Sequence, residues 1–354
     1  MIAIDKDVEN KLKESAKFIK QVLSEAPSHI KFELCDEENA PSREPLLMDK
    51  DINENSFESI SEKSTFTSKI AAIDGGSTKI ANGHSFYIGA YRYGYVIFDS
   101  NGLIKEDISP LTIETISAVN SDEKFSKLYF KILKKLPEEL PKFQTTLDHL
   151  RTLKEWTLAE RLIDELNKGD ILLMDGSLRS SPALPNILLE RICKKAAEKK
   201  INLVGVTKTS TLYWGKHSLL IPIIHKIGED FHPGKKWFCL LSDFKENTLN
   251  MRWFGTIYVA KLFPASKFVF RVDINRFDPT SPKKIMETLA AISRDPNYMG
   301  YPYPLAAIHN RVRIDPYEKE DLHYRLQGLA LKEGVKIKEW EALFSNFHEL
   351  LDIN

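Results

Sequence analysis

The sequence predicts an α/β fold: a mixed β-sheet flanked by helices, with an extra β-rich portion and a helical C-terminus. Three observations lead to this fold class. From about residue 68 the chain shows three strand-like runs, followed by helix, strand, helix and strand. Residues 211–280 are rich in aromatic and β-branched side chains, and about the last 70 residues return to helical patterns. Strands that alternate with helices indicate parallel strands joined by crossover helices.

Composition limits the class of protein. The 354 residues include 50 basic and 50 acidic side chains, so the formal net charge is zero and nucleic-acid binding would need local basic clusters. The cysteines Cys35, Cys193 and Cys239 are too scattered to indicate a disulfide framework or a zinc site. No run approaches the roughly 18 apolar residues of a membrane span, and the N-terminus lacks a signal-peptide core. We therefore expect a soluble, cytoplasmic protein with no membrane partner.

The N-terminal segment, residues 1–67, is expected to hold a helix and an exposed connection. Residues 6–25 have an amphipathic helical pattern, and residues 36–67 are polar and rich in Asp, Glu, Asn, Ser and Pro. Aromatic and β-branched runs then predict three antiparallel strands between about 68 and 113, with an Asn-Gly turn between two of the runs.

The next stretch alternates helices with buried strands. Helical patterns cover roughly 121–136, 144–167 and 184–199, and the strands DILLMDGS and INLVGVTK follow the second and third helices. The chain thus has the ribonuclease H-like order of elements: three strands, then helix, strand, helix and strand. In this order a meander is extended by parallel strands. Actin-like ATPases share this order.

The remaining chain predicts an extended or inserted sheet and then helices. The β portion spans about 211–280, and helices are expected at 282–294 and 304–315, with two more to the C-terminus. We take residues 68–315 as one domain and residues 316–354 as helices that pack on it.

Two aspartates follow apolar runs and precede glycine, in AAIDGGS and LLMDGSL. Asp74 and Asp175 are each predicted to end a strand, and each alone is as compatible with a turn as with a functional site. Because the first and fourth strands of this topology are neighbours, both carboxylates would face one cleft.

A third carboxylate is expected from the helix between these strands, and Glu155 and Glu160 compete for the role. Glu155 lies on the apolar helix face, in register with Ala159, Leu162, Ile163 and Leu166. Glu160 lies on a solvated face, which favours Glu155 without excluding Glu160. Helix and strand lengths also favour Glu155. Asp175 lies roughly 16 Å into its strand, and about 11 helical residues span the same distance. Counted back from the helix end, they reach residue 155 or 156. Clustered carboxylates of this kind suit Mg²⁺ or Mn²⁺.

Near the C-terminus, residues 298–314 read YMGYPYPLAAIHNRVRI. Pro304 is expected in the first turn of a helix, with Tyr301 and Tyr303 beside it and His309 one to two turns further on. In isolation this motif is also compatible with a packed Tyr-Pro turn and a structural histidine.

In combination, these segments resemble the NurA nuclease family. The matching pieces are AAIDGGS, LLMDGSL after a glutamate-bearing helix, GVTKTS at 205–210, and GYPYPLAAIHN. Their order and approximate spacing match from about residue 68 to 315. The last motif is the most specific of the four.

The resemblance implies a ribonuclease H-like fold and Mn²⁺-dependent cleavage of single- and double-stranded DNA, with Mg²⁺ as the alternative metal. It implies 5′ to 3′ exonuclease and single-strand endonuclease activity, a homodimer, and work with a HerA-type hexameric ATPase in DNA end resection and double-strand break repair. Carried over by position, the metal ligands are Asp74, Glu155, Asp175 and His309, and the further catalytic residues are Lys208 and Tyr301.

DNA contacts are expected beside this centre. Lys208 would offset charge on the phosphate, and Tyr301 would position the nucleotide by a hydrogen bond or by stacking. His309 would complete the metal shell or donate to the phosphate. We also assign Arg179, which follows Asp175, and Tyr303 to DNA binding.

Two other classes of function stay open from the residues. An actin-like or sugar-kinase-like ATPase would use DGGSTK as a phosphate loop, but Gly75-Gly76 is the only Gly-Gly pair, and no G-x-x-x-x-G-K-[ST] segment occurs. A catalytically silent scaffold for a DNA-repair ATPase would retain the same fold.

Overall fold

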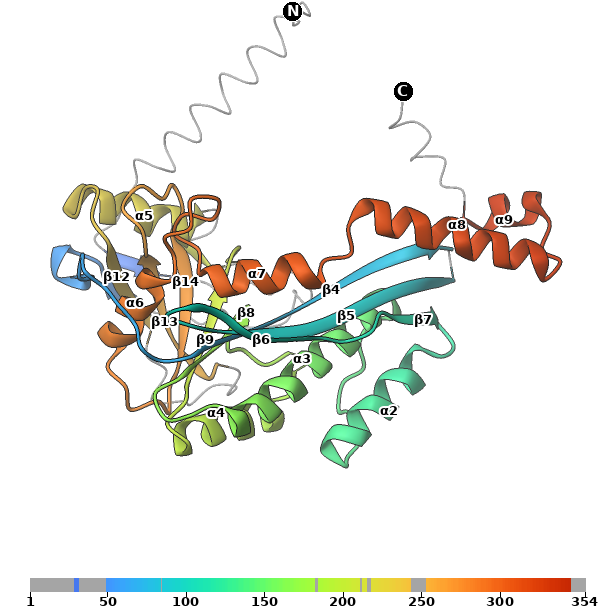
Figure 1. Cartoon of the computed structure of the whole chain (residues 1–354), viewed down its shortest axis with the longest axis horizontal. Helices are drawn as coiled ribbons and strands as arrows, with labels where there is room; N and C mark the ends of the chain where they lie inside the picture. Colours follow the sequence, from blue (N-terminus) through green and yellow to red (C-terminus); the bar gives the residue numbers. More distant parts are fainter. Residues whose placement is uncertain are drawn as a thin grey trace, which may run out of the picture.

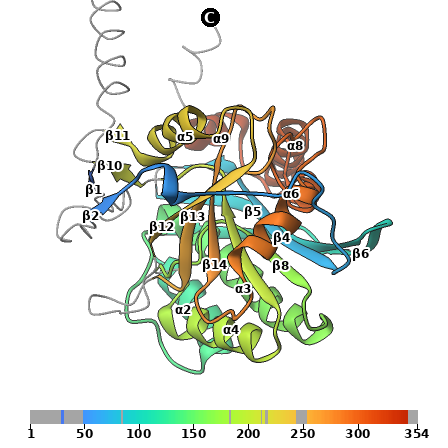
Figure 2. The same cartoon turned by 90° about the vertical axis from the view of Figure 1, so that its left-hand side faces the viewer.

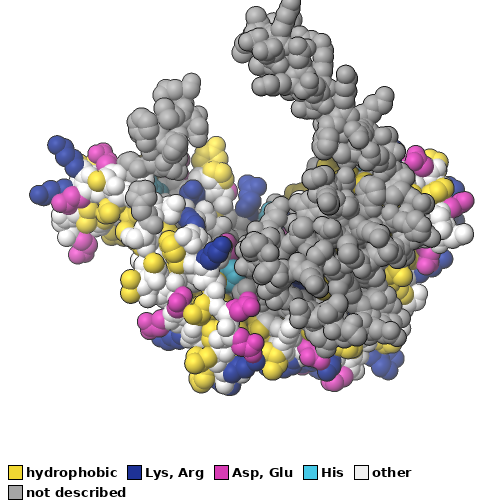
Figure 3. All heavy atoms as spheres, turned by 180° about the vertical axis from the view of Figure 1, so that it is seen from behind, with side chains coloured by type: hydrophobic (Ala, Val, Ile, Leu, Met, Phe, Trp, Pro, Cys, Tyr) yellow, Lys and Arg dark blue, Asp and Glu magenta, His cyan; other side chains and the backbone are white. Residues whose placement is uncertain are grey.

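The computed structural model describes residues 29–31, 49–83, 85–181, 184–210, 212–214, 218–242 and 253–344. The helix expected at residues 6–25 lies outside these residues, as does the first part of the polar connection. Figures 1 and 2 show a long sheet with helices on both faces. Where Figure 3 shows described residues, basic and acidic side chains lie among one another on the surface.

Among the described residues, one large mixed sheet contains ten strands. They are β3 (Phe57–Ser59), β4 (Ile70–Asn82), β5 (Phe86–Asp99), β6 (Gly102–Ile108), β7 (Thr112–Ser117), β8 (Ile171–Asp175), β9 (Asn202–Thr207), β12 (Trp237–Ser242), β13 (Gly255–Lys261) and β14 (Phe270–Asn275). Their order is β3-β12-β13-β14-β9-β8-β4-β5-β6, and β7 pairs with the first half of β5. The neighbours β4, β8 and β9 run parallel, and the other pairs are antiparallel.

Two short hairpin-like sheets lie outside this order. One joins β1 (His29–Lys31) to β2 (Asp49–Asp51), and the other joins β10 (Tyr213–Trp214) to β11 (Ser218–Leu219).

The described helices are α2 (Ser121–Leu133), α3 (Thr146–Glu165), α4 (Asn186–Glu198), α5 (Leu220–Phe231), α6 (Pro282–Ala291), α7 (Tyr303–Val312), α8 (Pro316–Lys332) and α9 (Ile337–Phe344), with short 3₁₀ turns η1 (Glu54–Ser56) and η2 (Phe143–Thr145). Figure 1 shows α3 and α4 below the sheet and α7 above it. None of the helices in the described part of the chain is long and apolar enough to cross a lipid bilayer.

Strand β4 separates the two main cores by the alternation of its side chains. Ala71 and Ile73 pack in the core beneath α3 and α4, whereas Ile70 and Ala72 pack in the core that includes α6 and α7. Successive strand residues point to opposite faces of a sheet. Asp74, the next residue in this series, therefore points to the α7 face.

The predicted fold class is confirmed, and most predicted elements are present close to their expected bounds. The expected three-strand meander contains a fourth strand, β7, which extends the pairing of the long strand β5. The Asn-Gly turn joins β5 to β6, where Gly102 has a φ of +131° that favours glycine. The β-rich portion at 211–280 extends the same sheet through β12, β13 and β14.

The β-rich portion also contains a helix that the prediction missed. Helix α5 buries Leu220, Ile223, Ile224, Ile227 and Gly228, which have helical spacing. The isoleucines have high strand propensity, and this local preference led to the prediction of a strand despite the helical spacing of the apolar residues.

The expected exposed connection at 36–67 is wrong for its last part. Residues 57–59 form the edge strand β3, which pairs with β12. Phe57 is buried and its ring lies 5.1 Å from that of Trp237. A few apolar side chains in an otherwise polar segment therefore bring it onto the sheet.

Candidate active site

Asp74 lies in the middle of β4 rather than at its end. The prediction that this aspartate closes a strand before a glycine turn is wrong, because the strand continues to Asn82 and pairs with β5 along this stretch. Gly75 and Gly76 are needed because neighbouring helices approach the strand closely at these two positions. A Cβ on Gly75 would lie 2.2 Å from Glu155 Oε1, and one on Gly76 would lie 2.3 Å from the carbonyl oxygen of Val312. Helices α3 and α7 thus approach β4 from opposite faces of the sheet, at two positions that have no side chain.

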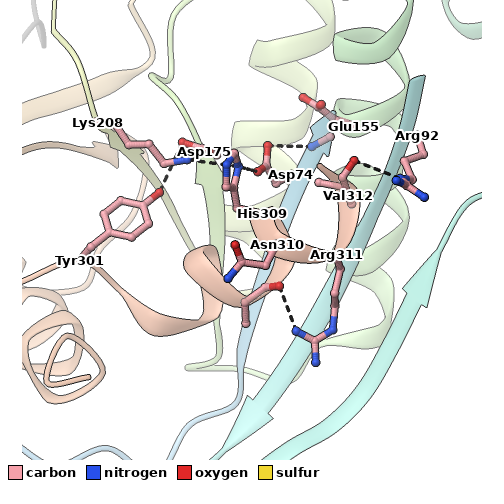
Figure 4. A network of polar contacts seen from close by, with 12 residues as sticks. Asp74, Arg92, Glu155, Asp175, Lys208, Tyr301, His309, Asn310, Arg311 and Val312 are labelled. Atoms are coloured by element: carbon pink, nitrogen blue, oxygen red, sulfur yellow. Dashed lines mark hydrogen bonds and ion pairs between the residues drawn. The ribbon is translucent and has the colours of Figure 1, made fainter. Parts of the chain in front are cut away.

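Asp175 is the last residue of β8, the parallel neighbour of β4, as predicted. It continues the series of Ile171 and Leu173, whose side chains belong to the core on the α7 face. Asp74 and Asp175 therefore point to the same side of the sheet, beneath α7 (Figure 4).

Helix α7 and the end of β9 bring the other polar groups to these carboxylates. His309 Nδ1 lies 2.8 Å from Asp74 Oδ2 and 3.5 Å from Lys208 Nζ. Lys208 follows β9 and donates to Asp175 Oδ2 at 2.6 Å. The hydroxyl of Tyr301, just before α7, donates to Asp175 Oδ1 at 3.4 Å. We refer to these five residues as the polar cluster (Figure 4).

The polar cluster contains a set of atoms that fits a divalent metal ion. Asp74, Asp175 and His309 each offer one ligand atom, and these atoms lie within 4.8 Å of one another. Carboxylate oxygens suit Mg²⁺ and Mn²⁺, and an imidazole nitrogen is a common metal ligand. Asp74 is buried, whereas the His309 side chain is 44% exposed, so the set is open to solvent on the histidine side.

Glu155 and Glu160 occupy different surroundings on α3. Glu160 accepts two hydrogen bonds from Arg191 of α4, at 2.8 and 2.9 Å. Glu155 is buried next to Gly75 and accepts a hydrogen bond from Arg151 at 2.8 Å. Arg151 also donates to the carbonyl oxygen of Gly75 at 2.6 Å, which ties Glu155 to β4 beside Asp74. Glu155 is thus adjacent to the polar cluster but outside the set of three close ligand atoms.

The pKa values reflect burial and crowded negative charge. Burial raises the pKa of Glu155 to about 7; Arg151 opposes this rise, and Asp74 and Asp175 add to it. Burial and the charge of Asp74 raise the pKa of Asp175, against the opposing effect of Lys208. Burial and the same two aspartates raise the pKa of Tyr301, so its hydroxyl stays protonated as a donor.

Two residues assigned to DNA binding lie outside the polar cluster. The guanidinium of Arg179 lies 4.9 Å from the ring centroid of Trp253, which also contacts Arg271. Tyr303 packs edge-on against Phe98, with ring centroids 5.5 Å apart. Arg179 thus packs on Trp253 and Tyr303 on Phe98, and neither contact involves Asp74 or Asp175.

Sequence reasoning missed two arginines that support the site. Arg151 precedes Glu155 by one helical turn, and this spacing was a readable signal for an ion pair. Arg92 of β5 donates to the carbonyl oxygens of Val312 and Arg313, at 3.1 and 3.0 Å, and so holds the C-terminal end of α7. No local pattern around Arg92 indicates this role, because its partners lie more than two hundred residues away.

Comparisons with known proteins agree with this architecture. The model of the NurA domain family matches residues 68–314. The crystal structure of the NurA nuclease from Sulfolobus solfataricus is similar with a TM-score of 0.58 and 17% identity, covering 94% of this chain and 99% of that chain. A comparison with curated protein sequences found no match.

More distant similarity extends to endonuclease V structures. The catalytic domain of human endonuclease V has a TM-score of 0.36 at 11% identity, covering 89% of this chain and 98% of that chain. The Ciona intestinalis endonuclease V in complex with inosine-containing DNA has a TM-score of 0.38 at 10% identity, covering 77% and 94%.

Proposed function

The chain belongs to the NurA family, and from this premise we propose that it is a metal-dependent DNA nuclease that hydrolyses phosphodiester bonds at the polar cluster. Family membership by itself supports a nuclease role. The observation that carries the proposal for this site is the convergence of Asp74, Asp175 and His309, which come from β4, β8 and α7.

In this proposal Asp74, Asp175 and His309 hold Mn²⁺, with Mg²⁺ as the alternative. The cation would polarise the phosphodiester and lower the pKa of the attacking water. Glu155 is proposed as the third carboxylate of the centre. Its raised pKa supports this role, because part of the shift comes from Asp74 and Asp175.

Lys208 and Tyr301 are proposed to act on the DNA phosphate. The Lys208 ammonium lies against Asp175 and would offset negative charge that develops on the phosphate oxygens. The Tyr301 hydroxyl, kept protonated by burial and the nearby aspartates, would donate a hydrogen bond that orients the phosphate. Arg179 and Tyr303 are proposed to contact DNA further from the cleaved bond.

The finer activity rests on resemblance to the family. We propose 5′ to 3′ exonuclease and single-strand endonuclease activity on DNA in the cytoplasm. A homodimer is proposed to work with a HerA-type hexameric ATPase in end resection and break repair. Residues 68–315 are proposed as the nuclease domain.

The competing ATPase hypothesis loses its main support. A phosphate loop needs a turn whose backbone N–H groups surround the phosphate. Residues Asp74 to Thr78 instead lie within β4 and pair with β5. The DGGSTK stretch is therefore a paired strand rather than a loop.

The test compares metal-dependent cleavage by the wild type and Asp74→Asn. Linear single- and double-stranded DNA is incubated with Mn²⁺, with Mg²⁺ and with EDTA. We expect cleavage with metal, none with EDTA, and none by Asp74→Asn. Asp164→Asn is the control, because Asp164 of α3 is exposed and pairs with Lys195 and Lys199 rather than with the polar cluster. Cleavage by Asp74→Asn at the wild-type rate would overturn the proposal.

A further inference from the structure

A cavity of about 630 Å³ lies next to the polar cluster and is not explained by the cleavage chemistry. It shares Lys208, Tyr301 and His309 with that cluster. Its volume lies within the range of about 300–1,000 Å³ that small-molecule sites occupy. A group held in this cavity would therefore lie beside a phosphate at the polar cluster.

The walls of the cavity are mainly aromatic and apolar. Phe268 and Met299 are 66% and 42% exposed, although both are large hydrophobic side chains. Phe270 also lines the cavity, with its ring centroid 5.2 Å from that of Tyr301. Exposed apolar side chains that rim a pocket beside a polar site are typical of a ligand-binding surface.

The two walls approach each other closely at Gly300 and Ser266. Gly300 has a φ of +87°, and a Cβ at this position would lie 2.5 Å from Ser266 Oγ. Ser266 in turn accepts from the backbone N–H of Phe268 at 3.0 Å and donates to the carbonyl oxygen of Phe268 at 2.9 Å. The loop that carries Phe268 and the turn that carries Met299 are therefore pre-arranged around the cavity.

The lining of the cavity also includes polar groups. Asn310 donates to the hydroxyl of Tyr298 at 2.7 Å, and both side chains line the space. Lys208 and Lys267 also line it and bring positive charge. An aromatic surface, a polar edge and nearby lysines match a planar heteroaromatic group attached to a phosphodiester.

We propose that this cavity binds a nucleobase of the DNA strand being cut, namely the base of a nucleotide whose phosphate lies at the polar cluster. This inference rests on the proposed nuclease function and adds a base subsite to it. The base would stack on Phe268 and contact Asn310 at its edge. A base in this cavity cannot be paired, so the strand is single at that nucleotide.

The test moves a single abasic tetrahydrofuran residue along a labelled single-stranded oligonucleotide and measures kcat/KM for each cleaved bond. We expect one position, fixed relative to the cleaved bond, at which the missing base slows the wild type about 5- to 150-fold, the range of base–aromatic stacking. Phe268→Ala should remove most of this discrimination, and Phe268→Trp should retain it. Phe130→Ala is the matched control, because Phe130 is 50% exposed on α2, away from the cavity.

The outcomes separate this inference from the proposed function. Cleavage of every abasic oligonucleotide at the same rate, or unchanged discrimination by Phe268→Ala, overturns the base subsite and leaves the nuclease intact. No cleavage of the unmodified oligonucleotide overturns the nuclease, and the base subsite with it. Because Phe268 is mostly exposed, its replacement should leave the fold unchanged, which the melting temperature checks.

Discussion

At the scale of single residues, Glu155 and Glu160 show how environment assigns different roles to the same side chain. Both belong to α3, yet Glu155 is buried against Arg151 and Gly75, whereas Glu160 pairs with Arg191 near the surface. Burying a carboxylate in this way is costly unless it is paired or bound to metal. A functional role would therefore explain why Glu155 is buried beside Asp74 with Arg151 as its partner.

We predict that Glu155→Gln lowers kcat/KM for DNA cleavage about 10- to 100-fold, the usual effect of losing a group that supports a metal centre. The matched control is Glu160→Gln on the same helix, which should stay within about 2-fold of the wild type. Cleavage assays with both variants at saturating Mn²⁺ measure the difference. Equal activity of the two variants would remove Glu155 from the proposed centre.

A second prediction at this scale concerns pH and the metal-free protein. The pKa of Glu155 is about 7 in the folded state against 4.5 for the ordinary side chain, so the folded state binds this proton more tightly than the unfolded state. Its contribution to stability, on the order of 3 kcal/mol, is full below pH 4.5 and is lost as the pH rises through 7. The raised pKa of Asp175 acts with the same sign.

We therefore expect the free energy of unfolding in EDTA to fall between pH 5 and pH 8. Glu155→Gln should show a smaller fall, and Glu160→Gln should follow the wild type. Urea unfolding at several pH values tests this expectation. A Glu155→Gln profile parallel to that of the wild type would contradict the assigned pKa.

At the scale of elements, the site depends on how closely α7 lies on β4. Gly76 meets the carbonyl oxygen of Val312, and Arg92 of β5 donates to the same carbonyl group. Because His309 is on this helix, the contact also sets the distance between His309 and Asp74. A backbone carbonyl cannot move aside as a flexible side chain can.

Gly76→Ala should therefore destabilise the protein by about 1–3 kcal/mol, as overpacking does, and should also lower cleavage activity. Gly328→Ala is the control, because nothing lies within 4 Å of a Cβ at that position of α8. Replacing a mid-helix glycine by alanine stabilises by about 0.5–1 kcal/mol. Unfolding in urea and the cleavage assay measure both effects, and an unchanged Gly76→Ala protein would show that α7 can shift freely.

At the scale of the whole molecule, the proposed metal ligands come from three distant parts of the chain. Asp74, Asp175 and His309 lie on β4, β8 and α7, and a bound cation would join these elements. A ligand that binds only the folded state stabilises it by mass action, by about 2.7 kcal/mol when present at a hundred times its dissociation constant.

We expect Mn²⁺ to raise the melting temperature of the wild type and of Asp164→Asn, but not that of Asp74→Asn or Asp175→Asn. Differential scanning calorimetry with and without EDTA measures this effect and does not depend on cleavage activity. A rise of the same size in Asp175→Asn would place the bound cation elsewhere.

The sequence by itself determined the elements whose signals are local. Short apolar runs identified the first part of β4 and the strands β8 and β9, and helical periodicity placed Glu155 rather than Glu160 on the buried face of α3. Family resemblance supplied Lys208, Tyr301 and His309, which lie together with the two aspartates in the polar cluster.

Only the tertiary structure decided what depends on contacts between distant residues. It made DGGST part of β4, paired with β5, and it brought α3 and α7 against this strand at Gly75 and Gly76. It gave Glu155 the partner Arg151 and set Arg179 against Trp253 instead of the polar cluster. A local sequence pattern predicts whether a segment is a helix or a strand and which of its faces is buried. Which residues contact that face depends on how the whole chain packs.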